Sequence, residues 1–285
     1  MALLTFIVPV RHQDNATDWS ALKERLSQTG TSIAGQSHHD WRAIVVANEG
    51  ADLPALPGQF VVERVTFPPN HLHDMASADR ETVYDAFRLD KGRRVLAGML
   101  AARDSRFFMI VDDDDFVSSN VAAHVSQHPN ANGWKLETGY FWSEGARYVL
   151  KTPNFWNLCG TSLIIRSDLY NLPENFEQAE EQFIKSMLGS HVRIGGILAD
   201  AGTPLGALPF PGAIYRVGHR GAHSQSSSLL RAHFLNRSLI RRPFRLLQNI
   251  ARVRLLGPTL RREFFGARTD DGAIAYGPSS VSAVG

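Results

Sequence analysis

The hydrophobic positions of this chain alternate between continuous apolar runs and stretches with helical spacing. Three short runs rich in β-branched residues are typical of strands that a parallel sheet buries on both faces: residues 5–10, 41–47 and 107–111. Between them, residues 18–26 have helical spacing with Asp18 as the predicted N-cap, and residues 91–103 place apolar side chains on one side. The alternation predicts an α/β fold whose central, mostly parallel sheet is flanked by helices.

The rest of the pattern adds strands, one helix and one long connection. Further strands are predicted at residues 60–67, 134–142, 148–150, 162–166 and 213–217. Residues 177–188 have helical spacing, with apolar side chains clustered on one face. Residues 68–90 are rich in Pro, His and Asp and show no regular period, so they are predicted to be a long loop with at most one helical turn.

Charge divides the chain into an acidic body and a basic extension. The 285 residues have a net charge of +2, but residues 228–268 hold ten arginines and one acidic residue, a net charge of +9. Because these arginines alternate with large apolar residues, the segment is predicted to be a basic amphipathic helical extension on an anionic membrane surface, with packing against the body as the alternative. Residues 269–285 are small and are predicted to be a disordered tail.

The sequence lacks both a pair of cysteines and a membrane-spanning apolar run, and these two features bear on the cellular compartment. Cys159 is the single cysteine, which excludes an intramolecular disulfide, and no apolar run approaches the ~20 residues that span a bilayer. We therefore expect a cytoplasmic protein, peripheral on the inner face of the cell membrane. The basic segment carries no nucleic-acid-binding motif, so no nucleic acid is expected as a partner.

Four consecutive aspartates follow the predicted strand at residues 107–111: Asp112, Asp113, Asp114 and Asp115. Their mutual repulsion is relieved most simply by a hard divalent cation with oxygen ligands. In open α/β sheets, ligands bind at the carboxyl ends of the strands, where this cluster lies. The cluster predicts a manganese(II) or magnesium(II) site, with an exposed acidic turn as the alternative.

The stretch from Phe107 to Phe116 resembles the aspartate-x-aspartate strand end of the family 2 inverting glycosyltransferases, and the resemblance spans much of residues 4–224. It implies a GT-A catalytic domain over residues 1–227. It also implies transfer of a sugar from a nucleotide-diphosphate donor, expected to be UDP-linked, to a glycan or lipid-linked acceptor.

The resemblance also implies site residues. The nucleotide-binding residues are predicted to be Pro9, Arg11, Glu49, Arg94, Asp112 and Asp113. Among them, Glu49 is expected to contact the base and Asp112 the ribose, while Arg94 faces the diphosphate. The metal ligands are predicted to be Asp114, with Asp115 in support, and one of two histidines, with His219 as the first candidate and His223 as the second.

An inverting transfer needs a base that removes the proton of the acceptor hydroxyl. Glu180 and Glu181, at the start of the predicted helix, resemble the acidic pair whose second member is the catalytic base in that family. Glu181 is therefore the first candidate and Glu180 the second. An acidic pair that only stabilises a helix N-terminus is the alternative.

Two competing functions remain for comparison. A sugar-phosphate nucleotidyltransferase needs a glycine-rich loop after the first strand, and residues 11–15 contain no glycine, which disfavours that class. A non-catalytic glycan- or membrane-binding protein built on a decayed transferase fold is the remaining alternative. Release of nucleoside diphosphate from a donor distinguishes it from an enzyme.

Overall fold

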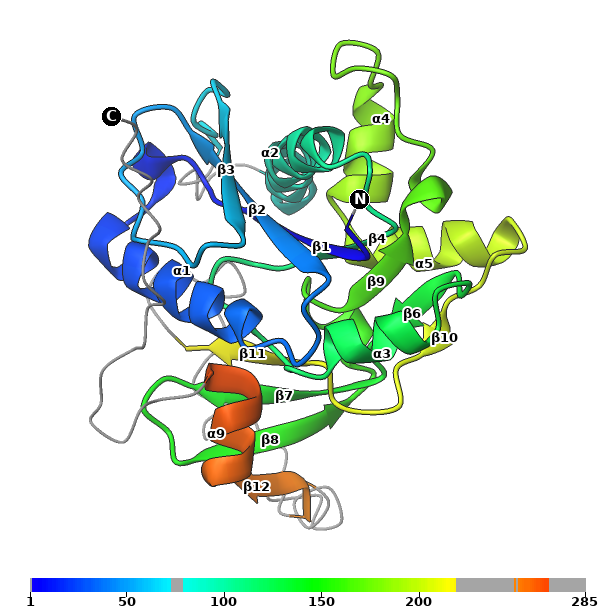
Figure 1. The fold of residues 1–285 in the computed structure, drawn as a ribbon. Coiled ribbons are helices and arrows are strands. Elements are labelled where there is room, and N and C mark those ends of the chain that lie inside the picture. The colour runs from blue at the N-terminus through cyan, green and yellow to red at the C-terminus, as the bar shows by residue number, and fades with distance from the viewer. Residues whose placement is uncertain (1, 73–78, 219–248, 250, 267–285) are drawn as a thin grey trace, which may run out of the picture.

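The computed structural model describes residues 2–72, 79–218, 249 and 251–266, which form two sheets covered by helices (Figure 1). The larger sheet has seven strands in the order β10-β6-β9-β4-β1-β2-β3. Their bounds are β1 (Leu4–Pro9), β2 (Trp41–Asn48), β3 (Phe60–Val65), β4 (Phe107–Ile110), β6 (Gly133–Lys135), β9 (Leu163–Arg166) and β10 (Gly206–Ala207). Because β4, β1, β2 and β3 run parallel and only β9 opposes its neighbours, the predicted mostly parallel sheet is confirmed.

The smaller sheet has five strands in the order β12-β8-β7-β11-β5. Their bounds are β5 (Phe116–Val117), β7 (Thr138–Ser143), β8 (Tyr148–Pro153), β11 (Ala213–Val217) and β12 (Val253–Leu255). The single strand predicted at residues 134–142 is two strands, β6 and β7, which belong to different sheets. The break falls at Leu136 and Glu137, within a stretch where polar and apolar residues already alternate, so the change of sheet does not stand out in the hydrophobic pattern.

Helices cover both faces of the larger sheet (Figure 1). On one face lie α1 (Trp19–Ala34) and α3 (Val121–Gln127), which pack on alternate residues of β1 such as Phe6 and Val8. On the other lie α2 (Arg80–Ala101), α5 (His191–Asp200) and the π-helix η4 (Ile184–Leu188), which pack around Ile7. Successive strand residues point to opposite faces, so burial on both faces explains the uninterrupted apolar runs. Asp18 caps α1 as predicted, accepting a hydrogen bond from the Ala21 amide at 2.9 Å.

Short elements complete the chain. They are the 3₁₀ helices η1 (Gln13–Asn15), η2 (Phe155–Asn157) and η3 (Ser167–Tyr170), the single turn α4 (Glu181–Phe183) and the helix α9 (Pro258–Phe265). The helix predicted over residues 177–188 begins at Glu181 and continues as η4. Among the described residues, no helix is both long and apolar enough to cross a membrane.

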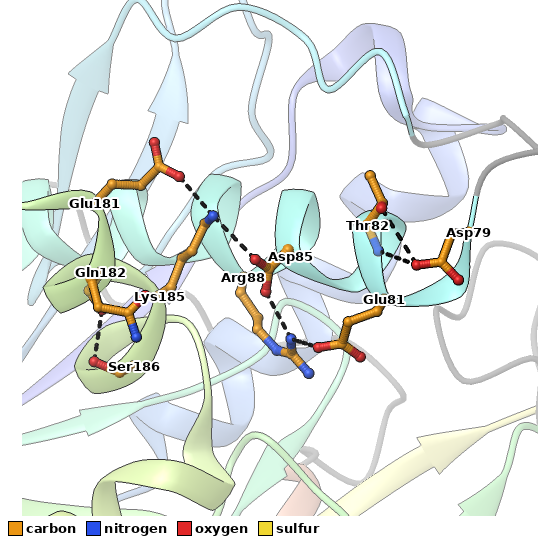
Figure 2. Close-up of polar contacts among 9 residues, drawn as sticks. All are labelled: Asp79, Glu81, Thr82, Asp85, Arg88, Glu181, Gln182, Lys185 and Ser186. Atoms are coloured by element: carbon orange, nitrogen blue, oxygen red, sulfur yellow. Dashed lines mark hydrogen bonds and ion pairs between the residues drawn. The ribbon is translucent and has the colours of Figure 1, made fainter.

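The predicted loop at residues 68–90 is wrong in its second half, because α2 begins at Arg80. Asp79 caps the helix by accepting from the Thr82 amide at 3.3 Å. Arg88 then binds Glu81 at 2.7 Å and Asp85 at 2.9 Å, contacts that Figure 2 shows along the helix. Ion pairs therefore stabilise the first half of α2, which lacks a clear apolar stripe. Hydrophobic periodicity does not reveal such pairs, so this half of the helix was not predicted.

The described part of the basic extension packs on the body. Within residues 249–266, β12 pairs antiparallel with β8 and α9 contacts α1, so this part contains a strand as well as a helix. Phe264 is fully buried, and the Glu263 carboxylate accepts from Ser118 Oγ at 2.6 Å. The predicted tail at residues 269–285 lies outside the described residues.

Candidate functional site

A cavity of about 380 Å³ lies where β1 and β4 end at their carboxyl sides. Its charged lining consists of Arg11, Arg88, Lys91, Arg94 and Arg216 with Asp90, Asp112, Asp113 and Asp114. The uncharged lining includes Pro9, Tyr84, Phe87 and the residues that begin α5. The structure thus brings six of the predicted site residues to one cavity: Pro9, Arg11, Arg94, Asp112, Asp113 and Asp114.

Asp112 is held at the edge of the cavity by contacts from two segments. The Lys91 ammonium on α2 donates to its carboxylate, and its backbone amide donates to Thr161 Oγ1 at 2.9 Å. Burial alone would lower the pKa of Lys91, but the Asp112 charge and hydrogen bond raise the pKa overall. Gly160 makes this approach possible, because a Cβ there would collide with Asp112 Oδ2 and lie 2.7 Å from Lys91 Nζ.

Asp113 is buried at a position where an ionised carboxylate is energetically unfavourable. Its side chain is 7% exposed, and its Oδ2 has no hydrogen-bond partner in the described part of the chain. Burial raises the pKa of Asp113 to about 6; the Arg11 charge opposes the shift, and the charges of Asp114 and Asp112 add to it. A buried carboxylate with a raised pKa in a cavity marks a candidate ligand-binding position.

Asp115 is not among the residues that line this cavity. It is fully buried and accepts hydrogen bonds from Thr161 Oγ1 at 2.7 Å, from the Cys159 thiol at 3.2 Å and from the Arg216 amide at 3.2 Å. Burial raises its pKa well above the ordinary value, and the Asp114 charge adds to the shift. The structure therefore places Asp115 as a connection between three segments, outside the lining that contains Asp114.

Two of the cavity arginines are fixed by the fold. Arg94 is 1% exposed and donates to Asp90 Oδ1 at 3.1 Å and to Asn48 Oδ1 at 2.7 Å. Arg216 is fully buried, with its guanidinium carbon 4.7 Å from the ring centre of Phe116, and its Nε has no partner in the described region. Rigid guanidinium groups suit the recognition of a phosphate-bearing ligand.

Glu49 does not line the cavity. It lies exposed in the turn after β2, and its amide donates to the Val65 carbonyl at 2.9 Å. The preceding residue, Asn48, is buried and contacts Arg94. Side chains alternate along a strand, so the position that faces inward at this strand end is Asn48.

The two predicted catalytic glutamates also lie outside the cavity lining. Glu180 and Glu181 are exposed at the start of α4. Glu181 forms an ion pair with Lys185 at 2.6 Å, and Lys185 binds Asp85 of α2 at 3.2 Å (Figure 2). The contacts in Figure 2 therefore connect α4 and η4 to α2.

The two histidines predicted as metal ligands, His219 and His223, lie outside the described residues.

His191 is a cavity residue that the sequence analysis missed. It is the first residue of α5, and its Nε2 is buried without a hydrogen-bond partner in the described structure. Burial, together with the nearby Lys91 charge, lowers the pKa of His191 to about 4. Helical spacing after Ser190, at Ile194, Ile197 and Leu198, is a signal that could have located the start of this helix.

The described residues supply only some of the ligands that a metal ion needs. Among the described residues, no group of three or more His, Cys, Asp or Glu side chains is arranged to hold a metal ion. However, Asp113 and Asp114 present carboxylates to the cavity, and one oxygen of Asp113 lacks a partner. Magnesium is commonly held by one or two carboxylates together with substrate phosphates. The residues therefore fit a divalent ion that binds with a phosphate-bearing substrate.

No protein-family profile and no curated protein sequence matches this chain. Solved structures do resemble it in fold. S. aureus TarS 1-349 in complex with UDP-GlcNAc has a TM-score of 0.41 and 15% identity over 79% of this chain and 61% of that chain. S. aureus TarS has a TM-score of 0.39 and 15% identity over 76% of this chain and 37% of that chain.

A chain from Desulfovibrio desulfuricans G20, described as a nucleotide-diphospho-sugar transferase, has a TM-score of 0.35 and 12% identity over 87% of this chain and 99% of that chain. This chain spans about 60% of the length of the TarS 1-349 chains that it matches. Likeness at this level concerns the arrangement of the backbone and assigns no activity to this protein.

Proposed function

We propose that this protein is a glycosyltransferase that moves a sugar, with inversion, from a UDP-linked donor to a glycan or lipid-linked acceptor. The observation that carries the proposal is the cavity at the strand ends, which combines four aspartates with five basic side chains. A nucleotide-sugar donor needs both kinds of group, because hydroxyls bind carboxylates and a diphosphate binds cations.

The contacts of Asp112 support the proposal that the sugar donor binds at this end of the cavity. Lys91 holds its carboxylate in one orientation, in which a ribose hydroxyl can donate to it. Arg11, Arg88 and Arg94 line the same cavity and supply positive charge for the diphosphate. Proximity of fixed charges of both signs orients an anionic donor without a large rearrangement of side chains.

Manganese(II) or magnesium(II) is part of the proposal, with Asp114 as its principal ligand and Asp113 beside it. When bound, the ion supplies Lewis-acid stabilisation of the departing diphosphate. The chain itself contributes the fixed guanidinium groups, which offset the same developing charge.

The rim of the cavity supports an acceptor with an apolar face. Tyr84 of α2 and Val192 of α5 both line the cavity, and they are 46% and 44% exposed. Exposed aromatic and aliphatic groups at the mouth of a polar cavity suit the apolar face of a pyranose ring or the first carbons of a lipid.

Association with an anionic membrane is a further part of the proposal. In the described part of the extension, Leu255 of β12 is 79% exposed and follows the exposed Arg254 in sequence, and α9 carries two further exposed arginines, Arg261 and Arg262. Arginines beside an exposed apolar side chain are typical of surfaces that contact headgroups.

A donor screen tests this function. UDP-, GDP- and dTDP-sugars are added with and without manganese(II), and the melting temperature and the release of nucleoside diphosphate are measured. UDP-sugars should raise the melting temperature most. Asp114→Ala should lose the manganese-dependent part of this rise and should release no nucleoside diphosphate. Asp200→Ala, an exposed control at the end of α5, should behave as wild type.

Two outcomes would contradict the proposal. Equal stabilisation by every nucleotide, or by none, would refute a specific donor site. Sugar binding without release of nucleoside diphosphate would instead establish the non-catalytic binding protein.

A further inference from the structure

The proposed transfer needs a group that accepts the acceptor's proton, and both glutamates suggested by sequence lie outside the cavity lining. The base must be within hydrogen-bond reach of the reacting hydroxyl. Glu181 is engaged by Lys185 on the exposed side of α4 (Figure 2). The base is therefore expected among the groups that line the cavity.

The described lining contains five side chains able to accept a proton: Asp90, Asp112, Asp113, Asp114 and His191. Asp90 is bound to Arg94, and Asp112 is bound to Lys91. Within this set, Asp113 Oδ2 and His191 Nε2 are buried acceptor atoms without a hydrogen-bond partner among the described residues.

These two groups come from different elements that line the cavity. Asp113 belongs to the aspartate run after β4, the part proposed to hold the donor and its metal. His191 begins α5, next to the exposed Val192. Because Asp113 is proposed to lie beside the metal, His191 is the unpartnered base of the lining that remains for the acceptor hydroxyl.

The environment of the ring indicates which nitrogen is free. A neutral imidazole carries the hydrogen on one nitrogen and the lone pair on the other. Nε2 has no hydrogen-bond partner among the described residues, so we assign the lone pair to Nε2. The backbone of Asn157 acts to raise the pKa of His191 against the larger effect of burial, as a nearby carbonyl does.

We propose that His191 is the general base of the transfer, with Nε2 taking the proton of the acceptor hydroxyl. The inference rests on the proposed function. As the O–H bond breaks, the acceptor oxygen forms a bond to the anomeric carbon. The bond from that carbon to the diphosphate oxygen breaks, its electron pair leaves with the nucleoside diphosphate, and the imidazolium later returns the proton to solvent.

The charges around the ring are compatible with this role. Burial and Lys91 lower the pKa of His191 to about 4, while Asp112 opposes them, so the ring is neutral near pH 7. Such a base is about as strong as an ordinary carboxylate, the group that inverting transfer commonly uses. In the transition state, a developing imidazolium is stabilised by Asp112 and by the anionic donor.

The test compares His191→Ala and His191→Gln with wild type and with His128→Gln, a matched exposed histidine at the end of α3. The donor that wild type turns over is used, and kcat, KM and the donor-dependent shift in melting temperature are measured. Both His191 variants should lose about 100-fold or more in kcat with the thermal shift unchanged. Added imidazole should restore part of the rate in His191→Ala, and His128→Gln should match wild type.

The outcomes separate this inference from the proposed function. If wild type releases no nucleoside diphosphate from any donor, the proposed function fails and this inference with it. If wild type is active and His191→Gln keeps its kcat within about threefold, or imidazole gives no rescue, the inference alone is overturned. Loss of activity in Glu181→Gln but not in the His191 variants would assign the base to Glu181.

Discussion

Replacement of Asp113 by asparagine should stabilise this protein at neutral pH, although it removes a group from the proposed donor site. Asp113 is 7% exposed, and its Oδ2 has no partner among the described residues. Its pKa rises from 3.8 to about 6 on folding, chiefly through burial. A neutral amide of the same shape avoids the cost of a buried charge.

The magnitude and the pH window follow from this pKa. A rise of roughly 2 pKa units corresponds to about 3 kcal/mol at 1.36 kcal/mol per unit. An acid whose pKa is raised by folding contributes to stability in its protonated form. For Asp113 this contribution is fully present below the unfolded pKa of 3.8, and it is lost as the pH rises through the folded pKa of about 6. The advantage of Asp113→Asn should therefore be largest above pH 6 and vanish below 3.8.

Urea denaturation measures this difference in unfolding free energy. Wild type, Asp113→Asn and the exposed control Asp200→Asn are unfolded at about pH 7.5, 5 and 4. Asp113→Asn should gain about 1 to 3 kcal/mol at the highest pH and weaken the binding of the UDP-sugar. No gain near pH 7.5, or a gain that grows on acidification, would refute the reasoning, since either means that Asp113 is not destabilised by its burial.

Three further substitutions test the packing around the site. Gly160→Ala should separate Asp112 from Lys91 and weaken donor binding about tenfold by calorimetry, and unchanged binding would show that this ion pair is dispensable. Phe264→Ala should cost about 3 to 5 kcal/mol in urea denaturation, and a loss below 1 kcal/mol would mean that α9 is not docked. Asp18→Ala should cost about 1 kcal/mol through the lost cap of α1, whereas a neutral result would contradict the cap.

The sequence by itself determined the central sheet and the location of the site. The runs that became β1, β2 and β4 are apolar at consecutive positions, and such runs are stable only when both faces are buried. The aspartates follow one of these strands directly, so their place at its carboxyl end is fixed by chain connectivity. These features are local, and local periodicity is what a single sequence displays.

Only the tertiary structure decided which acidic groups face the cavity. Four adjacent aspartates look equivalent in sequence, but the turn after β4 directs Asp112, Asp113 and Asp114 to the cavity and Asp115 to Thr161 and Cys159. The difference depends on segments about forty-five residues away along the chain, since Asp115 and Thr161 are 46 residues apart. No local pattern encodes such a contact.

The same holds for the proposed bases. Glu181 stands where the sequence resemblance suggested a base, but Lys185, which also binds Asp85 of α2, engages it outside the cavity (Figure 2). As a lone histidine, His191 carried no signal in the sequence, and the packing of α5 against η4 and η2 brings it into the lining with Lys91. The sequence thus determined the strands and the aspartates at their ends, while long-range packing decided which side chains surround the cavity, because those contacts join elements far apart in the chain.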